Sequence, residues 1–108
     1  MVTREEFVLE DGSHLEVIRW NNEKGRDGTG RNRILWSRDE ELERKMVHFS
    51  VENDMVIVDL VSIGNKDASP STRSLPMRDD YNGMKFPLEN FTYPDIFITL
   101  DALGAFDG

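Results

Sequence analysis

One densely hydrophobic stretch, residues 46–63 (MVHFSVENDMVIVDLVSI), constrains the fold more than any other part of the chain. Asn53 and Asp54 interrupt it, and both residue types tolerate the positive φ that a two-residue hairpin turn requires. Opposed residues of a hairpin share a face, so this turn sets Val47 opposite Leu60, whereas a three-residue turn would bring Asp59 onto the apolar face. The sequence therefore predicts a β-hairpin whose apolar face carries Val47, Phe49, Val51, Val56, Val58 and Leu60.

The other face of this hairpin carries a candidate catalytic group. The same register places His48 opposite Asp59, with Ser50 two residues along the strand. A nucleophilic triad needs the base in contact with the hydroxyl and a carboxylate behind the base. Two residues on one strand face are too far apart for that contact, and no oxyanion-hole motif follows Ser50. The pattern favours a structural ion pair, and we predict no catalytic residue, although a small hydrolase using His48 and Asp59 is an alternative.

Composition narrows the class of protein. A chain of 108 residues predicts one compact domain, residues 1–108. Cysteine is absent, which excludes disulfides and thiolate metal sites. No apolar run reaches the length of about 18 residues that a membrane span requires, and the acidic N-terminal segment lacks the basic flank of a signal peptide. These features predict a soluble, cytoplasmic protein with no cofactor and no metal.

The formal charge of −8 is unevenly distributed. Residues 1–45 carry nine basic and eleven acidic side chains, and residues 46–108 carry four basic and ten acidic ones. Binding to nucleic acid relies on Lys and Arg that displace counterions from phosphates, so the charge argues against direct contact with nucleic acid. An acidic surface either keeps a protein in solution or complements a basic partner.

Residues 5–20 predict a first hairpin, bent at Asp11-Gly12 by an odd-numbered loop of three or five residues. A three-residue loop at 11–13 sets Leu9 opposite Leu15 and gathers the apolar residues on one face. His14 then lies in an acidic neighbourhood on the outer face. A metal site would need three or four convergent ligands, so we expect a solvated histidine there.

Residues 21–33 (NNEKGRDGTGRNR) form a Gly- and Arg-rich loop by composition. Glycines allow backbone amides to approach a phosphate, and arginines supply positive charge. The spacing matches no phosphate-binding fingerprint, so a solvated connection is the simpler interpretation. The alternative is an anion or nucleotide site formed by Arg26, Gly28, Gly30, Arg31 and Arg33.

Two further segments complete the expected architecture. Ser37 and Glu40 fit a helix capping box, which predicts a short surface helix near residues 38–45, with a charged loop as the alternative. Residues 91–100 (FTYPDIFITL) alternate in a way that predicts a last strand. The fold class expected is α+β, mainly antiparallel β, as a meander or a small barrel or half-barrel of 5–7 strands.

The long segment 64–90 contains three prolines and no sustained period of 2 or 3.6 residues. Loops of this length inside a compact domain tend to be functional or disordered. Its apolar residues either pin the loop to the core or form a recognition surface in which Tyr and Met are adaptable contacts. The candidate partner-binding residues are Asp79, Asp80, Tyr81, Met84 and Phe86.

Small size, acidity and the lack of a catalytic signature together predict a protein-binding module rather than an enzyme. We expect an inhibitor or antagonist of another macromolecule that acts by surface occlusion. Toxin-immunity proteins and phage-type inhibitors of bacterial defence or nucleic-acid-handling proteins represent this class. The expected partner is a protein with a basic surface, with no membrane contact and with a homodimer through the sheet as an option. The alternative is an oligomer that binds a small anionic ligand through the Gly/Arg loop.

Overall fold

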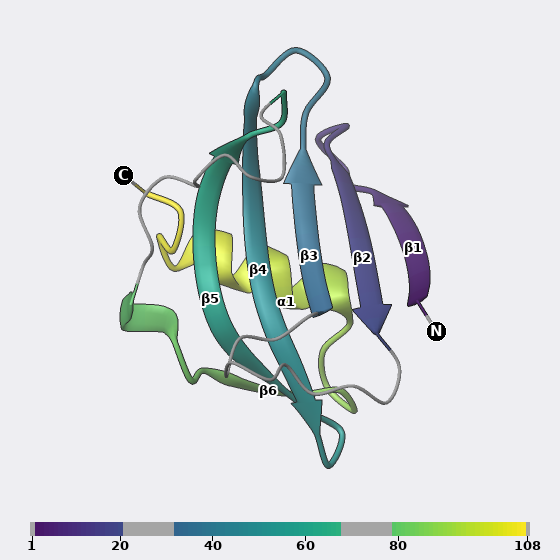
Figure 1. Ribbon diagram of the computed structural model, residues 1–108, viewed down its shortest axis with the longest axis vertical. Helices are drawn as coiled ribbons and strands as arrows, with labels where there is room; N and C mark the ends of the chain where they lie inside the picture. Colours follow the sequence, from purple (N-terminus) through teal and green to yellow (C-terminus); the bar gives the residue numbers. More distant parts are fainter. Residues whose placement is uncertain (1, 21–31, 68–78, 108) are drawn as a thin grey trace.

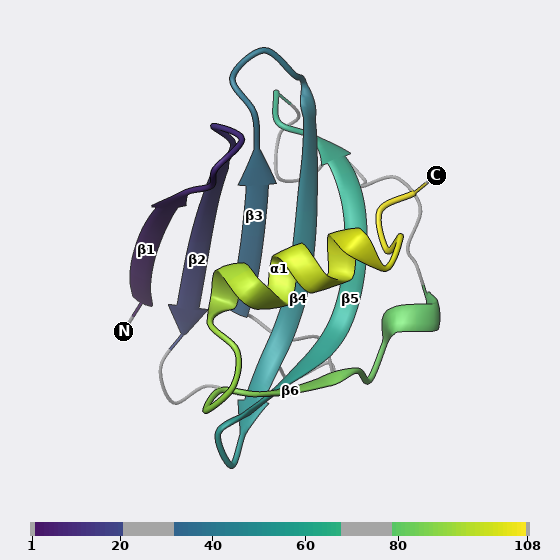
Figure 2. The same cartoon turned by 180° about the vertical axis from the view of Figure 1, so that it is seen from behind.

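The structure is a computed structural model that describes residues 2–20, 32–67 and 79–107. In this part of the chain six strands form one antiparallel sheet in the order β1-β2-β3-β4-β5-β6, and one helix crosses a face of it (Figures 1 and 2). The strands are β1 (Val2–Val8), β2 (His14–Trp20), β3 (Asn32–Ser37), β4 (Glu43–Glu52), β5 (Met55–Asn65) and β6 (Lys85–Pro87). A 3₁₀ turn, η1 (Asp79–Tyr81), precedes β6, and the helix α1 (Tyr93–Ala102) follows it. The predicted class, a mainly antiparallel α+β meander, is confirmed.

The hydrophobic core lies between the sheet and α1. Alternate residues of β2 to β5 point toward the helix, as the two-residue period of a strand requires. From the helix, Ile96, Phe97 and Leu100 are fully buried against them. One helix is enough to cover this face because β4 and β5, the two longest strands, run beneath it (Figure 2).

The central hairpin forms with the predicted two-residue turn. Asn53 and Asp54 have φ values of 52° and 58°, and Glu52 pairs with Met55. Phe49 pairs with Val58, as expected. The turn was predictable because Asn and Asp tolerate the left-handed region that other side chains avoid.

The outer half of this hairpin does not follow the predicted register. The pairing shifts between His48 and Phe49, so that Val47 faces Val61 rather than Leu60. An extra residue on β5, Asp59, is accommodated as a β-bulge, which reverses the faces of the residues beyond it. Val61 is therefore buried in the core, while Leu60 is only partly buried.

The segment predicted as a last strand, residues 91–100, contains most of the helix α1 (Tyr93–Ala102), so that prediction is wrong. Thr92 caps α1: its hydroxyl accepts a hydrogen bond from the Asp95 N–H (3.2 Å), and the Asp95 carboxylate accepts one from the Thr92 N–H (3.0 Å). Pro94 lies in the first turn, where a helix needs no N–H donor. The alternation of Ile96, Ile98 and Leu100 misled the prediction, because Ile96 and Leu100 are also one helical turn apart.

The helix predicted near residues 38–45 is absent, since residues 38–42 form a turn and a short connection and β4 starts at Glu43. The segment has no apolar face to bury, and Leu42 is 59% exposed. Lys66 holds the connection instead, because its ammonium donates to the Arg38 carbonyl (2.6 Å) and to the Asp39 carbonyl (3.2 Å). A capping sequence without an apolar stripe did not produce a helix.

The other predicted boundaries need smaller corrections. The first hairpin has an odd-numbered loop, but Leu9 pairs with Ser13, so the register differs by two residues and Phe7 pairs with Leu15. The predicted loop 21–33 ends earlier, because β3 begins at Asn32. The predicted loop 64–90 is interrupted by the end of β5, by η1 and by β6. Among the described residues, no helix is long and apolar enough to cross a membrane.

Candidate functional site: an acidic groove between the helix and two turns

Two of the predicted partner-binding residues belong to the interior. Phe86, on β6, is 3% exposed and meets Phe91 edge-on with ring centroids 5.2 Å apart. Met84 is partly buried and packs against the core. β6 pairs with β5 and turns its central side chain inward, so the structure places Phe86 in the core and not on the surface.

The other predicted residues of this segment lie in or beside η1. The Tyr81 hydroxyl donates to the Leu103 carbonyl (2.8 Å), just past the end of α1. This bond and the packing of the ring against the core tie the segment to the helix. Asp79 and Asp80 form the start of η1, and Asp80 is exposed.

Most of the predicted anion-binding loop lies outside the described residues. Arg33 is described: it lies on β3, is partly buried, and pairs in register with His48 on β4. The residues that lie outside are Arg26, Gly28, Gly30 and Arg31.

The bulge in β5 alters the candidate Ser/His/Asp group. The Ser50 hydroxyl donates a hydrogen bond to the Asp59 carboxylate, whose two oxygens lie 3.1 and 3.0 Å from the hydroxyl oxygen. His48 pairs in register with Leu60 rather than with Asp59. The hydroxyl is therefore bonded to the carboxylate, whereas a nucleophilic triad places the imidazole between the two.

His14 lies beside an acidic residue from another part of the chain. Its Nε2 atom is 3.7 Å from an Asp39 carboxylate oxygen, and both side chains are well exposed. Within residues 2–20, 32–67 and 79–107, no group of three or more His, Cys, Asp or Glu side chains could hold a metal ion.

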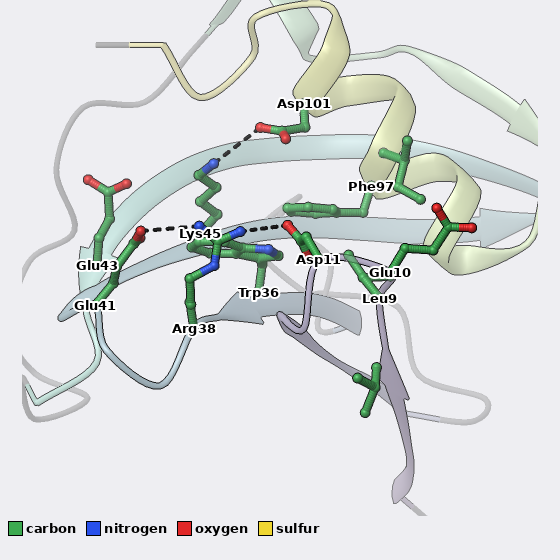
Figure 3. Close-up of a pocket in the computed structure, with 12 residues that line it drawn as sticks. Leu9, Glu10, Asp11, Trp36, Arg38, Glu41, Glu43, Lys45, Phe97 and Asp101 are labelled. Atoms are coloured by element: carbon green, nitrogen blue, oxygen red, sulfur yellow. Dashed lines mark hydrogen bonds and ion pairs between the residues drawn. The ribbon is translucent and has the colours of Figure 1, made fainter.

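A groove of about 710 Å³ lies between α1, the β1–β2 turn and the β3–β4 connection (Figure 3). Its walls come from segments far apart in the sequence. We call it the acidic groove. Its described lining residues are Val8, Leu9, Glu10, Asp11, Trp36, Arg38, Glu41, Glu43, Lys45, Phe97, Ile98 and Asp101.

The β1–β2 turn supplies one wall of the acidic groove. Asp11 accepts hydrogen bonds from the backbone N–H (3.0 Å) and hydroxyl (2.5 Å) of Ser13, and Gly12 adopts a φ of 85°. These bonds, together with the nearby Arg38 guanidinium, hold the pKa of the Asp11 carboxyl below its usual value. The turn is fixed, and Asp11 remains an anion at neutral pH.

The β3–β4 connection supplies the opposite wall. Arg38 extends across the groove, with one guanidinium nitrogen 2.5 Å from Asp11 and another 3.4 Å from Glu41 (Figure 3). Its guanidinium carbon also lies 5.4 Å from the centre of the Trp36 ring, within the range of a cation–π contact. Arg38 therefore joins the two walls above an aromatic ring.

The floor is aromatic and is shared between the sheet and the helix. Trp36 on β3 stacks on Phe97 of α1, with ring centroids 6.3 Å apart and an angle of 7° between the planes. The Lys45 ammonium lies 4.5 Å from the Trp36 ring centre and 3.2 Å from an Asp101 carboxylate oxygen. This packing sets the position of α1 relative to β3 and β4.

The groove has a negative rim and two exposed apolar side chains. Its described lining includes five carboxylates and two cations, and both cations are paired with carboxylates of the groove itself. Glu10 and Glu43 form no ion pair with any described residue. Val8 is 71% exposed and Ile98 is 50% exposed. The arrangement can accept a cationic side chain that has an apolar neighbour.

The groove does not follow from the sequence pattern, because its floor depends on α1, and the alternation of residues 91–100 predicts a strand there. One signal was available: Thr92 and Asp95 have capping-box spacing, with Pro94 between them. Comparisons of the chain with protein families, with characterised proteins and with solved structures find no match.

Proposed function

We propose that the protein is a small acidic protein-binding module that acts in the cytoplasm as an inhibitor or antagonist, by covering a basic surface of another macromolecule. The observation that carries the proposal is the acidic groove. Exposed apolar side chains inside a charged rim are typical of interaction sites. Val8 and Ile98 provide the apolar contact, and the carboxylates around them provide the charge.

The charge of the acidic groove supports a basic partner. Arg38 and Lys45 are occupied by intramolecular ion pairs, so they offer little attraction to an acidic ligand. Glu10 and Glu43 line the groove and form no ion pair with a described residue, so they can contact a partner. Complementary charges speed association and exclude wrong partners. The occupant we propose is a partner segment that carries Arg or Lys beside an apolar residue.

This mode of action needs no reaction. Proteins that handle nucleic acids expose basic surfaces that bind phosphate, and an acidic protein of this size can block such a surface. Phage-type inhibitors and toxin-immunity proteins act in this way, and the proposal places this chain in that functional class.

A charge-neutralised variant tests the proposal. Glu10→Gln combined with Glu43→Gln removes two rim charges without a change in shape. We expect this variant to bind an Arg- and Leu-containing probe peptide roughly fivefold more weakly, since each exposed charge pair contributes up to about 1 kcal/mol. Fluorescence anisotropy at low and moderate salt measures the affinity, and the difference should shrink as salt is added.

The matched control neutralises the same number of charges elsewhere. Glu52 and Glu89 are exposed near the β4–β5 turn, at the opposite end of the sheet from the groove (Figure 1). Glu52→Gln with Glu89→Gln should leave binding unchanged. If both variants lost the same amount of affinity for the peptide, net charge alone would explain the effect. That result would refute the groove as the binding site. A third variant, Asp79→Asn with Asp80→Asn, tests η1: loss in this variant alone would move the site there.

A further inference from the structure

β1 is an edge strand of the sheet, and no described strand or helix lies beside its outer edge (Figures 1 and 2). Among the described strands it pairs only with β2, in a register without interruption. Six of its seven residues are exposed. The strand, VTREEFV, has no proline and no bulge, two devices that keep an edge from pairing, and its protection is limited to the charges of Arg4, Glu5 and Glu6. This edge can therefore accept another strand.

The direction of the free backbone groups follows from the β1–β2 turn. The Leu9 N–H donates to the Ser13 carbonyl (2.8 Å), so the backbone groups of Leu9 point toward β2. Peptide groups of alternate residues in an antiparallel strand point to opposite sides. The odd-numbered residues of β1 thus bond to β2. The outward N–H and C=O groups belong to Val2, Arg4, Glu6 and Val8.

These four residues form a self-complementary row. Two copies of β1 that meet antiparallel around Glu5 place Val2 opposite Val8, and Arg4 opposite Glu6, twice each. Opposed side chains of opposite charge stabilise a strand pair, and opposed like charges destabilise it. A shift of two residues in one direction opposes Arg4 to Arg4, and a shift in the other direction opposes Glu6 to Glu6. The register centred on Glu5 avoids both.

We propose that the protein self-associates through β1 in this register, so that the sheets of two copies join into one continuous sheet with both helices on the same side. The pairing and the acidic groove share Val8, but the variants proposed below change only Thr3, Arg4, Glu5 or Glu6, none of which lines the groove. A seven-residue strand pair is at the low end of interface sizes. The result is a monomer–dimer equilibrium that depends on concentration.

The two Glu5 side chains oppose each other at the two-fold axis of this dimer. Like charges directly opposite each other destabilise a strand pair, so Glu5 weakens the association at neutral pH. Replacing it with an uncharged residue should strengthen the dimer. The same central position also provides a direct test of the register.

A single cysteine at position 5 makes the register measurable. Residues opposed across a non-hydrogen-bonded pair have Cα atoms about 4.5 Å apart, within the range of about 4.4–6.8 Å that a disulfide spans. The chain has no cysteine, so Glu5→Cys can form a disulfide only with a second copy. The matched control is Thr3→Cys on the same face, where the two cysteines would lie about 13 Å apart along the strand.

In a glutathione redox buffer, Glu5→Cys should form a disulfide-linked dimer at least tenfold faster than Thr3→Cys, as measured by intact mass under non-reducing conditions. Faster cross-linking at position 5 supports the register. Equal rates at the two positions, or no linked dimer at either, would overturn it.

Complementary charge variants test the association itself. Arg4 also pairs with Glu16 of its own chain (2.8 Å), so Arg4→Glu removes that ion pair as well as opposing Glu to Glu across the dimer. Glu6→Arg alone opposes Arg to Arg, and each variant should dimerise roughly tenfold more weakly than the wild type. An equimolar mixture of the two restores both pairs and should form a heterodimer at least as tight as the wild-type dimer. Sedimentation equilibrium measures all three, and thermal melts establish that each variant is folded. A mixture no more associated than its separate components would refute the proposal.

Discussion

Two isoleucines, two positions apart in residues 91–100, provide a sharp test of the helix and of the core that depends on it. In a strand, Ile96 and Ile98 would lie on the same face. In α1, Ile96 is 0% exposed and packs in the core, while Ile98 is 50% exposed on the groove side. The same substitution, Ile→Ala, can be made at both positions. The two arrangements therefore predict different results for chemically identical changes.

The expected cost at Ile96 follows from its burial. Ile→Ala removes three carbon groups, each of which contributes about 0.8 kcal/mol of transfer free energy when buried. Because the cavity left behind fills only partly, the free energy of unfolding should fall by about 3 kcal/mol, inside the usual range of about 2–5 kcal/mol. At Ile98 the free energy of unfolding should change by no more than about 0.5 kcal/mol, as for other surface substitutions. The higher helix propensity of Ala offsets part of it.

Urea unfolding followed by far-UV circular dichroism measures both changes. With a slope of about 1.5 kcal/mol per molar urea, Ile96→Ala should lower the midpoint by about 2 M, and Ile98→Ala should move it by less than about 0.4 M. Equal losses at the two positions would show that they share a face, and the helical phase of this segment would be wrong. Ile98→Ala is also predicted to weaken binding at the acidic groove, where this residue is exposed.

Three further changes test the helix cap, the hairpin turn and β6. Thr92→Ala should lower the free energy of unfolding by about 1 kcal/mol in the same urea assay, since it removes the N-cap. The hydrogen bond from the Thr92 backbone N–H lowers the pKa of Asp95 below its ordinary value of 3.8. The stability that this carboxylate provides is present above pH 3.8 and lost as the pH falls through the lower folded pKa, so Asp95→Asn should reduce the acid dependence of the melting temperature. Asn53→Ala should cost about 1 kcal/mol in urea, because alanine is strained at a φ of 52°, whereas Asp54→Gly should raise the midpoint slightly. Phe86→Ala should cost about 3–5 kcal/mol by thermal melting, as expected for a core residue and not for a surface contact.

The sequence predicted the central hairpin because its turn and its alternation point to the same register. Asn53 and Asp54 set the turn, and the pairs next to it follow from the two-residue period. The prediction failed at Asp59, where one extra residue enters the strand. The bulge moves the buried positions from Val56 and Val58 to Val61 and Ile63. Leu60 next to Val61 is also apolar, so the alternation alone did not reveal this change of phase.

The two capping sequences of the chain explain the errors in helix placement. Ser37 with Glu40 and Thr92 with Asp95 have the same spacing, yet only the second begins a helix. The difference is the apolar surface that follows, because packing against the sheet stabilises a short helix more than its cap does. The candidate groove was beyond prediction for a related reason. Its walls come together only when α1 lies across the sheet, and no local sequence pattern predicts that packing.

The position of α1 in the chain has a consequence for synthesis. Each strand pairs with a neighbour in sequence, from β1 to β6, so the sheet can assemble as the chain emerges from the ribosome. Its apolar face stays bare until Ile96, Phe97 and Leu100 have been made, because the helix that buries it follows all six strands. Nascent chains that stall or terminate before this helix would expose that face to solvent and to chaperones. The helix thus determines when the newly made protein becomes resistant to aggregation.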